Sequence, residues 1–307
     1  MFSNYNSIMQ NLIYPVFFIL FGLFSSAAQE ITNDIADEKE NIDKPEAYKI
    51  YNSKGKEVSY KKMIKSLAEN DLIFFGELHN NTISHWLQIE LTRDLYAIKG
   101  EQVILGAEMF ESDNQVILNE YFLGYISQSN FEKEMRLWPN YSTDYKPLIE
   151  FAKENNLRFA ATNVPRRYAS MVSKEGLDKL KELPSHSQIF MAPMPIDVNM
   201  EVECYRKMLE MSEGNVNFPQ AQMLKDATMA YFILNNWSRG DFFIHFNGSY
   251  HSDSKEGIIH YIKLKEKNLR IMNITTVEQD NIYKLNKEYY EKADFIICTP
   301  VRMTKTY

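Results

Sequence analysis

The sequence of 307 residues contains only two cysteines, Cys204 and Cys298. A thiolate metal site needs three or four closely spaced ligands, so two distant cysteines exclude one. The pair is compatible with one disulfide bond in an oxidising compartment. Two unreactive thiols are the simpler interpretation.

An excess of basic residues is also absent. The formal net charge is −7, which argues against a broad basic surface and against nucleic acid as a partner. No low-complexity segment is present, and the apolar and charged fractions are those of an ordinary globular protein. Aromatic residues, in contrast, are numerous, with 19 Tyr and 19 Phe. They usually fill cores, but they also line pockets for flat ligands.

The apolar run near the N-terminus, Leu12–Phe24, is shorter than the roughly 20 residues that a membrane span needs. Small residues at Ser26 and Ala28 follow it, so residues 1–28 are predicted to be a secretory signal peptide. The first eleven residues lack Lys and Arg, which leaves an uncleaved anchor as the alternative. Because no Cys follows the run, a lipoprotein is not indicated. We expect an exported protein, either periplasmic or membrane-associated.

Residues 29–46 are charged and poor in large apolar side chains, which predicts a flexible linker before a domain over 47–307. In this domain, apolar runs typical of strands alternate with segments of helical spacing, such as Thr82–Lys99. The runs are Leu72–Phe75, Val103–Met109, Leu157–Thr162, Phe242–Phe246, Ile271–Thr275 and Phe295–Cys298. This alternation predicts an α/β fold with a mostly parallel central sheet flanked by helices.

Two segments do not fit a simple strand–helix–strand crossover. Residues 112–145 carry aromatic and apolar side chains without a strand run, and residues 174–236 are long and mostly helical, interrupted by Pro193 and Pro195. We interpret both as helical insertions that form a smaller subdomain or a lid beside the sheet.

The spacing Gly-x-x-His occurs twice, at Gly76–His79 and at Gly248–His251. Both copies follow predicted strands, and other polar residues also follow strands. Because the carboxyl ends of parallel strands share one edge of the sheet, these residues are predicted to converge there. The set is Glu77, His79, Glu108, Asn163, Arg166, Arg167, Asn247 and His251.

The chemistry of this set allows two kinds of site. Two His and a carboxylate can hold a divalent metal with a position open for water, and a second carboxylate can act as general base. Arg166 and Arg167 offer guanidinium groups to a carboxylate or phosphate, although Arg167 could instead pair with a surface acid. Gly76 and Gly248 would let the chain turn sharply and approach a ligand closely.

Several other polar residues have simpler interpretations. His85 is expected to be a solvated helix residue, His245 a buried core histidine, and His186 and His260 surface residues. Gln222 and Asp226 lie on one helical face by their four-residue spacing. They form either a structural hydrogen-bond network or a set that orients ligands.

The sequence resembles the ChaN-like family of haem-binding proteins, within the Tiki superfamily, from about Tyr48 to the last predicted strand. The segments that carry the resemblance are GELH (76–79), AEMF (107–110), YKPLIEFA (145–152), NVPRR (163–167), QMLKDATMA (222–230) and GSYH (248–251). The resemblance implies an α/β core with a smaller helical portion, attachment or export in bacteria, and a role in haem or iron acquisition. The superfamily also includes metal-dependent proteases and esterase-like enzymes.

Two hypotheses follow. In the first, an exported protein binds haem for uptake, with Asn163, Arg166 or Arg167 at the ligand and a Tyr or His reaching the iron. Tyr250 beside the second histidine is a candidate because phenolates bind ferric haem, and Tyr121, Tyr125, Tyr141 and Tyr145 compete with it. Uptake machinery at the outer membrane and a second copy of the chain are the expected partners.

In the second hypothesis the protein is a metal-dependent hydrolase. His79, His251 and Glu108 would then hold a metal-bound water, and Glu77 would assist proton transfer.

Overall fold

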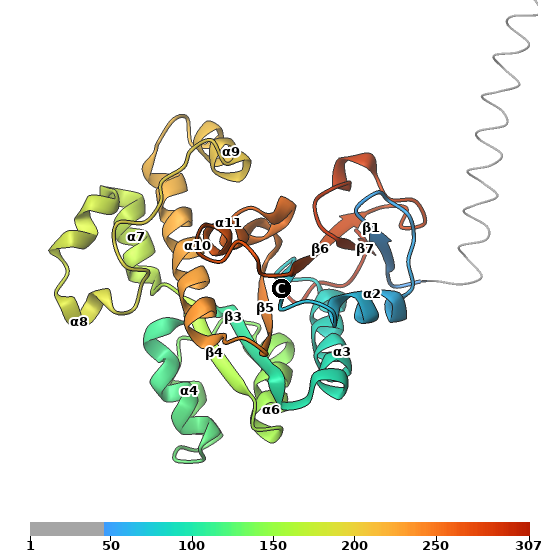
Figure 1. The fold of residues 1–307 in the computed structure, drawn as a ribbon, viewed down its shortest axis with the longest axis horizontal. Helices are drawn as coiled ribbons and strands as arrows, with labels where there is room; N and C mark the ends of the chain where they lie inside the picture. The colour runs from blue at the N-terminus through green and yellow to red at the C-terminus, as the bar shows by residue number, and fades with distance from the viewer. Residues whose placement is uncertain (1–45) are drawn as a thin grey trace, which may run out of the picture. The chain divides into compact units, whose positions relative to one another are not determined.

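The computed structural model describes residues 46–307, and residues 48–307 form one compact unit. The predicted signal peptide and nearly all of the predicted linker lie outside the described residues. Seven strands form one sheet (Figure 1). They are β1 (Lys49–Asn52), β2 (Leu72–Glu77), β3 (Val103–Glu111), β4 (Arg158–Asn163), β5 (Phe242–Gly248), β6 (Ile271–Gln279) and β7 (Phe295–Pro300).

The helices between the strands are α2 (Tyr60–Leu67), α3 (Thr82–Lys99), α4 (Gln115–Phe122), α5 (Gln128–Glu134), α6 (Lys146–Glu154), α7 (Arg166–Glu175), α8 (Ser185–Gln188), α9 (Glu203–Met211), α10 (Asn217–Asn236) and α11 (Ile258–Lys265). A π-helical turn, η3 (Tyr141–Tyr145), precedes α6. The short 3-10 turns are η1 (Gly100–Gln102), η2 (Ser112–Asn114), η4 (Leu177–Glu182), η5 (Ser249–His251), η6 (Asp253–Lys255) and η7 (Lys287–Tyr289).

The strand order is β1-β7-β6-β2-β5-β3-β4. All pairs are parallel except β1 with β7, which confirms the prediction of a mostly parallel α/β sheet. Each of the six predicted apolar runs forms a strand. The edge strand β1 was not predicted, because a four-residue segment, KIYN, is too short to show periodicity.

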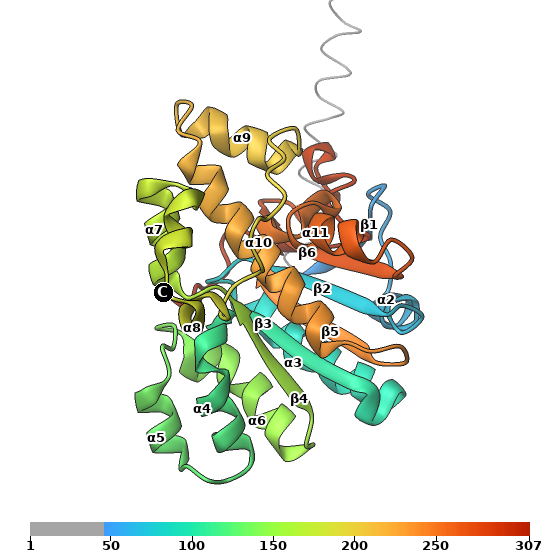
Figure 2. The ribbon, with the colours of Figure 1, turned by 60° about the vertical axis from the view of Figure 1, so that its left-hand side comes forward.

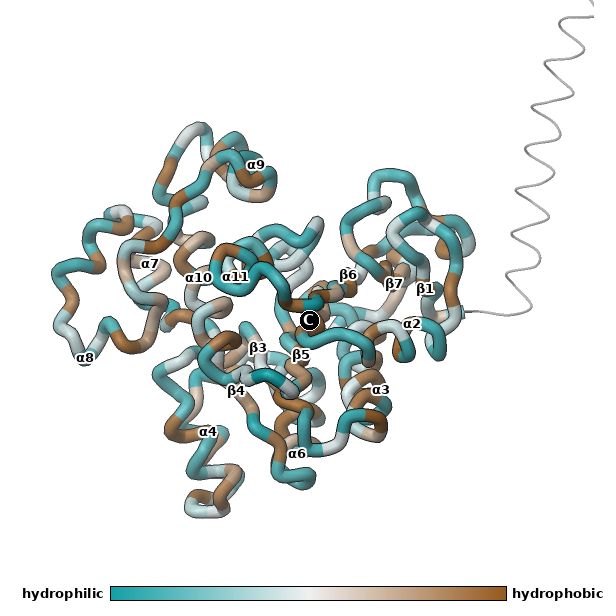
Figure 3. Tube along the Cα trace, viewed as in Figure 1, coloured by the Kyte–Doolittle hydropathy of each residue, from teal (hydrophilic) through white to brown (hydrophobic). Residues whose placement is uncertain are grey.

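Side chains alternate across the sheet and divide the core into two layers. Ile73 and Phe75 of β2 pack in a cluster with α2, α3, α4, α5 and α6, whereas Leu72 and Phe74 pack in a second cluster with α9, α10 and α11. Figure 2 shows α3 and α6 on one side of the strands and α10 and α11 on the other. Figure 3 shows hydrophobic residues in the central strands, and hydrophobic and hydrophilic residues mixed along the surrounding helices. This arrangement leaves the carboxyl edge of the sheet to the connecting loops.

Within residues 112–145 and 174–236 the chain forms helices and no strand. In the second of these segments, α10 packs against α7 through a third apolar cluster that contains Val172, Leu180 and Leu224. Helix α7 begins at Arg166, shortly after the end of β4, and Pro165 is the N-cap residue of the helix. The α7–α10 pair therefore stands beside the carboxyl edge of the sheet.

Cys204 and Cys298 are buried and unbridged, in separate clusters, so the disulfide alternative is not realised. Burial raises the pKa of the Cys298 thiol to about 12, so this thiol stays protonated and unreactive near neutral pH. Among residues 46–307 the structure has no helix with the length and apolar character of a membrane span.

Candidate functional site

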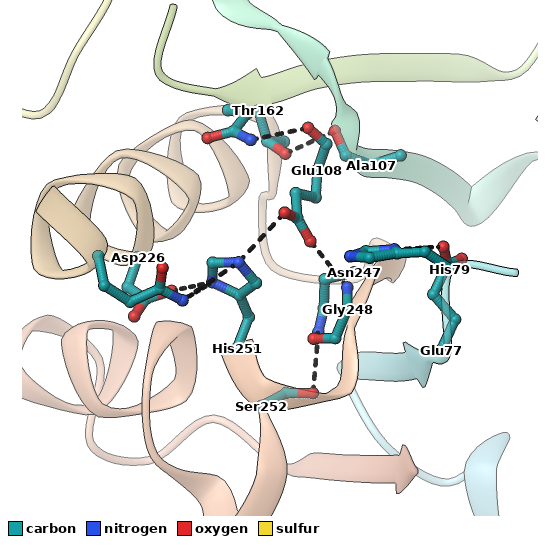
Figure 4. Close-up of polar contacts among 12 residues, drawn as sticks. Glu77, His79, Ala107, Glu108, Thr162, Asp226, Asn247, Gly248, His251 and Ser252 are labelled. Atoms are coloured by element: carbon teal, nitrogen blue, oxygen red, sulfur yellow. Dashed lines mark hydrogen bonds and ion pairs between the residues drawn. The ribbon is translucent and has the colours of Figure 1, made fainter. Parts of the chain in front are cut away.

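The two Gly-x-x-His motifs lie side by side at the carboxyl edge of the sheet (Figure 4). Strands β2 and β5 are neighbours, and their parallel register sets Glu77 beside Gly248. Glu108 lies in the neighbouring strand β3, just beyond the regular pairing of Ala107 with Phe246. The convergence that the sequence predicts for these residues is therefore present.

Each glycine, because it lacks a side chain, leaves room for residues of the other motif. A Cβ on Gly76 would lie 2.8 Å from Ser249 Cα, and a Cβ on Gly248 would lie 2.8 Å from His79 Nε2. Neither glycine has a positive φ, so the sharp turn that we expected is not their role. They allow the ends of β2 and β5 to approach closely.

His251 lies buried between two carboxylates. Its Nε2 is 3.1 Å from Glu108 Oε1, its Nδ1 contacts Asp226, and the Gln222 amide lies 3.0 Å from Nδ1. Burial by itself lowers the pKa of His251, but the charges of Glu108 and Asp226 outweigh burial and raise the pKa to about 10. His251 is therefore a buried cation at neutral pH.

Glu108 is held as an anion by the groups around it. Its Oε2 accepts a hydrogen bond of 2.7 Å from the Gly248 N–H, and Asn163 Nδ2 donates to its backbone oxygen at 2.9 Å. Burial raises the pKa of Glu108, yet His251, His79 and the Gly248 N–H together bring it well below its usual range. Glu108 thus links the second motif to β3.

His79, by contrast, is partly open to solvent, with 36% of its side chain exposed. Its Nδ1 lies 2.9 Å from Glu77 Oε1, and the Trp138 ring packs edge-on against it at 4.8 Å between centroids. Burial lowers the pKa of His79, but the hydrogen bond to Glu77 and the charge of Glu108 reverse this effect and raise the pKa above its ordinary value.

Glu77 is buried beneath His79 and has two further donors. Tyr145 Oη donates to Oε1 at 2.6 Å, and Gln88 Nε2 donates to Oε2 at 2.6 Å. Burial and the Glu77 charge raise the pKa of Tyr145 above its ordinary value. Tyr145 therefore remains a hydroxyl donor to Glu77.

His85 corrects one of our expectations. It is not solvated but buried, with Nε2 3.1 Å from the His79 backbone oxygen and 3.3 Å from Asp144 Oδ2. Asn140 Nδ2 also donates to the His79 oxygen, at 3.0 Å. The hydrogen bonds from His85 and Asn140 thus fix the loop that carries His79.

Residues 304–306 also bind the loop that carries His79. Asn80 O accepts a hydrogen bond of 3.0 Å from Thr306 N, and Asn81 pairs with Lys305 in an isolated antiparallel bridge. Thr82 Oγ1 donates to Thr304 O at 3.2 Å. We call residues 304–306 the C-terminal segment.

His245 and His186 lie as predicted, whereas His260 is less exposed than the surface residue that we expected. His245 is fully buried in β5, where its Nε2 lies 2.8 Å from Thr162 Oγ1 and its Nδ1 3.0 Å from Asn247 Oδ1. Burial lowers the pKa of His245 to about 4, so it is a neutral core residue. His186 is exposed and His260 is half-buried.

The hydrolase hypothesis required His79, His251 and Glu108 to act as converging metal ligands. Within residues 46–307 no group of three or more His, Cys, Asp or Glu side chains is arranged to hold a metal ion. The reason lies in His251, because both of its ring nitrogens face carboxylates, which favours the protonated ring over one with a free lone pair. The hydrolase alternative has no observation in its favour here.

A cavity of about 580 Å³ opens beside this site between β3, β4, α7, α9 and α10. Its wall includes apolar, aromatic, cationic and acidic side chains. They are His79, Glu108, Glu111, Trp138, Asn163, Val164, Arg166, Ala169, Ser170, Ser173, Met208, Phe218, Ala221, Gln222, Lys225 and His251. The volume lies within the range of small-molecule and cofactor sites, roughly 300–1,000 Å³.

Two cations of this wall, Arg166 and Lys225, have no carboxylate or hydrogen-bond partner in the described part of the chain. Arg167, in contrast, turns away from the cavity and pairs with Asp113 at 2.7 Å, as one of its two interpretations predicts. Lys225 lies on the same face of α10 as Gln222 and Asp226, which contact His251. Gln222 and Asp226 thus form a buried hydrogen-bond network with His251, and a role in orienting ligands stays a prediction.

The tyrosines predicted as iron ligands lie outside the cavity wall. Tyr250 donates its hydroxyl to Cys204 O at 2.7 Å, and burial raises the pKa of Tyr250 to about 12. Tyr121 donates to Glu150, and Tyr145 to Glu77. Tyr125 is 76% exposed, and Tyr141 is buried.

The sequence model of a family described as haem-binding uptake, Tiki superfamily, ChaN, matches residues 63–262. The chain belongs to this family. A comparison with curated proteins finds no match. The family model spans both Gly-x-x-His motifs, the NVPRR segment and Asp226.

Among solved structures, ChaN of Campylobacter jejuni, described with cofacially bound haem, is similar to this chain. It has 16% identity and a TM-score of 0.60, over 82% of this chain and 97% of that one. A Bacillus cereus protein is 12% identical with a TM-score of 0.48, over 88% and 97% of the two chains. At these identities the likeness concerns the fold.

The residues of the cavity are compatible with the cofactor that the ChaN family name implies. Haem combines a flat apolar ring, two carboxylates and an iron that accepts nitrogen, sulfur or oxygen ligands. The cavity offers Trp138, Phe218 and Met208 for the ring, and it also has the unpaired cations Arg166 and Lys225. His79 is an accessible imidazole. The chemistry of this wall therefore fits haem.

Sequence reasoning missed several of these side chains. Gln88 belongs to a polar row with Ser84 and Thr92 on α3, and all three are fully buried; their four-residue spacing was the available signal. Lys225 precedes Asp226 in a segment that we had already singled out. Trp138 carries no periodic signal, because it lies in a connection without regular structure.

Proposed function

We propose that this protein is an exported haem-binding protein of haem or iron uptake, and that it binds haem in the cavity beside His79. One observation carries the proposal. Arg166, which is exposed, and Lys225, which is half-buried, line the cavity without acidic partners, so both charges are available to an anionic ligand. Two free cations in one cavity suit a ligand with two carboxylates.

The rest of the wall supports this proposal. Arg166 begins helix α7, so the positive end of the helix dipole adds to its charge. Met208 and Phe218 lie on α9 and α10 and give an apolar surface for the macrocycle. Arg166 and Lys225 would bind the propionates. Asn163, another residue of the cavity wall, has a side-chain oxygen without a hydrogen-bond partner among the described residues. When bound, the haem would supply an iron centre.

Export, delivery and assembly are further parts of the proposal. Residues 1–28 would direct export to the periplasm or to a membrane surface, and the protein would exchange haem with uptake machinery at the outer membrane. A second copy of the chain would cover the open side of the flat ligand. Size-exclusion chromatography with and without haem tests the dimer, and the N-terminus of the protein isolated from the producing cells tests cleavage after Ala28.

The main test is a titration of the full chain with ferric haem, followed by absorption spectroscopy. Each of Arg166→Ala and Lys225→Ala should weaken binding about tenfold, because a hydrogen bond to a charged group contributes roughly 1.5 kcal/mol. Arg239→Ala is the matched control, since Arg239 is exposed near the opposite edge of the sheet, before β5. Unsaturable binding by the wild type, or equal losses in all three variants, would contradict the proposal.

A further inference from the structure

We infer that the open edge of strand β4 is a strand-pairing surface, and that the side chain of Gln115 occupies it and keeps the chain from pairing edge to edge with a second copy of itself. The inference goes beyond the proposed function, because it involves neither haem nor the cavity beside His79. It is drawn from two hydrogen bonds between the Gln115 amide and the backbone of β4.

Strand β4 lies at the end of the sheet. The strand order ends with it, and its one neighbour among the described strands is β3. An edge strand presents N–H and C=O groups to any other strand that can align with it. A cavity of about 460 Å³ lies beside β4, and its wall includes Gln115, Leu157 and Phe159. The edge of β4 is therefore accessible from outside next to Gln115.

Gln115, the first residue of α4, takes the place that a residue of a further strand would have. Its Nε2 donates to Phe159 O at 2.9 Å, and its Oε1 accepts a hydrogen bond of 2.7 Å from Ala161 N. A parallel neighbour would bond the same two groups, on either side of Ala160, with its own N–H and C=O. Because Phe159 O can only accept and Ala161 N can only donate, the orientation of the amide is settled.

The amide is also fixed from its own helix, since the second hydrogen of Gln115 Nε2 is donated to Asn119 Oδ1 at 2.9 Å. Other protection at β4 is slight. Proline and charged side chains often protect edge strands, but the strand sequence RFAATN has no proline. Its one charged side chain, Arg158, is bound to Asn236 O and Asp241.

The opposite edge strand, β1, is closed in a different way. It pairs with β7 on one side, and the chain that follows β1 folds back along its other side. Val58 N donates to Ile50 O at 2.8 Å, and Asn52 N donates to Lys56 O at 2.9 Å. The chain thus occupies both edges of its own sheet, with backbone at β1 and with one side-chain amide at β4.

The test uses the full chain without haem. In Gln115→Ala the N–H of Ala161 should exchange with deuterium about fivefold to tenfold faster than in the wild type, because one hydrogen bond is lost. Sedimentation velocity should show that Gln115→Ala associates more than the wild type as its concentration rises. Amide protection should then return over residues 158–163. Gln128→Ala, at an exposed glutamine that bonds Glu132 on the same helix, is the matched control and should behave as the wild type.

A second measurement does not depend on how well a variant folds. In nitrogen-15 NMR of the wild type, the side-chain amide hydrogens of Gln115 should exchange slowly with water, unlike those of Gln128. Equally fast exchange at both glutamines would overturn the inference. Unchanged exchange at Ala161 in Gln115→Ala, or no association beyond that of the wild type, would overturn it too. Association that protects other amides but not residues 158–163 would show that β4 is not the pairing surface.

Discussion

At the scale of single residues, the site is governed by how its two histidines are paired. His251 lies between Glu108 and Asp226, whereas His79 has one nitrogen held by Glu77 and, among the described residues, no hydrogen-bond partner for the other, which packs against Gly248. The same Gly-x-x-His spacing therefore yields a buried structural cation in one copy and an accessible base in the other. Their difference comes from the carboxylates around them and not from the motif.

The buried position of His251 makes its partners important for stability. Asp226→Asn should lower the free energy of unfolding by roughly 3–5 kcal/mol, because removing one partner of a buried ion pair leaves the remaining charges uncompensated. Urea denaturation at pH 7, followed by circular dichroism, measures this loss. Asp178→Asn, at a carboxylate that is 91% exposed, should leave the midpoint unchanged. Equal midpoints for both variants would show that the pair is not stabilising.

The site residues that lie close to a strand end could be predicted from the sequence, and those farther from one could not. Glu77, His79, Glu108 and His251 could be placed, because parallel strands carry their ends to one edge. Trp138 and Lys225 could not, since they reach the cavity only through the packing of the inserted helices. His85 was misjudged because its position outside the apolar stripe of α3 suggested solvent, whereas Asp144 and the His79 loop cover it.

At the scale of elements, the close approach of β2 and β5 is what assembles the site. Gly76 packs against the backbone of Ser249 and of Ile274, and Gly248 packs against His79. The contact is reciprocal, so each strand end sets the position of the other's motif. Strand prediction was reliable here, because fully apolar runs mark strands that are covered on both faces. The pairing of these two strands was not readable from either run alone.

Adding one methyl group at this contact should be costly. Gly76→Ala would place a Cβ 2.8 Å from Ser249 Cα and 3.0 Å from Ile274 O, and neither backbone atom can rotate away. We expect a loss of roughly 1–3 kcal/mol, as for other overpacked core positions. Thermal and urea unfolding measure it, and near-ultraviolet circular dichroism reports any shift of the aromatic site. A variant as stable as the wild type would mean that β2 and β5 can move apart freely.

At the scale of the whole molecule, the ion pairs of His251 link stability to pH. The folded-state pKa of about 10 lies above the ordinary value of 6.5, so His251 stabilises the fold fully below pH 6.5. This stabilisation is lost as pH rises through 10. The stability gap between wild type and His251→Gln should therefore shrink steadily from pH 6.5 to 10. Urea midpoints of both proteins at pH 6, 8 and 10 test this, and a constant gap would refute it.

The C-terminal segment has a consequence for how the fold is completed. Thr304 holds Thr82, which lies 222 positions earlier in the sequence, and Lys305 and Thr306 hold the residues beside it. Such a long-range contact forms only when the intervening chain has been brought together, and this closure costs conformational entropy. We therefore expect the His79 loop to be fastened late in folding, after the sheet on which it stands.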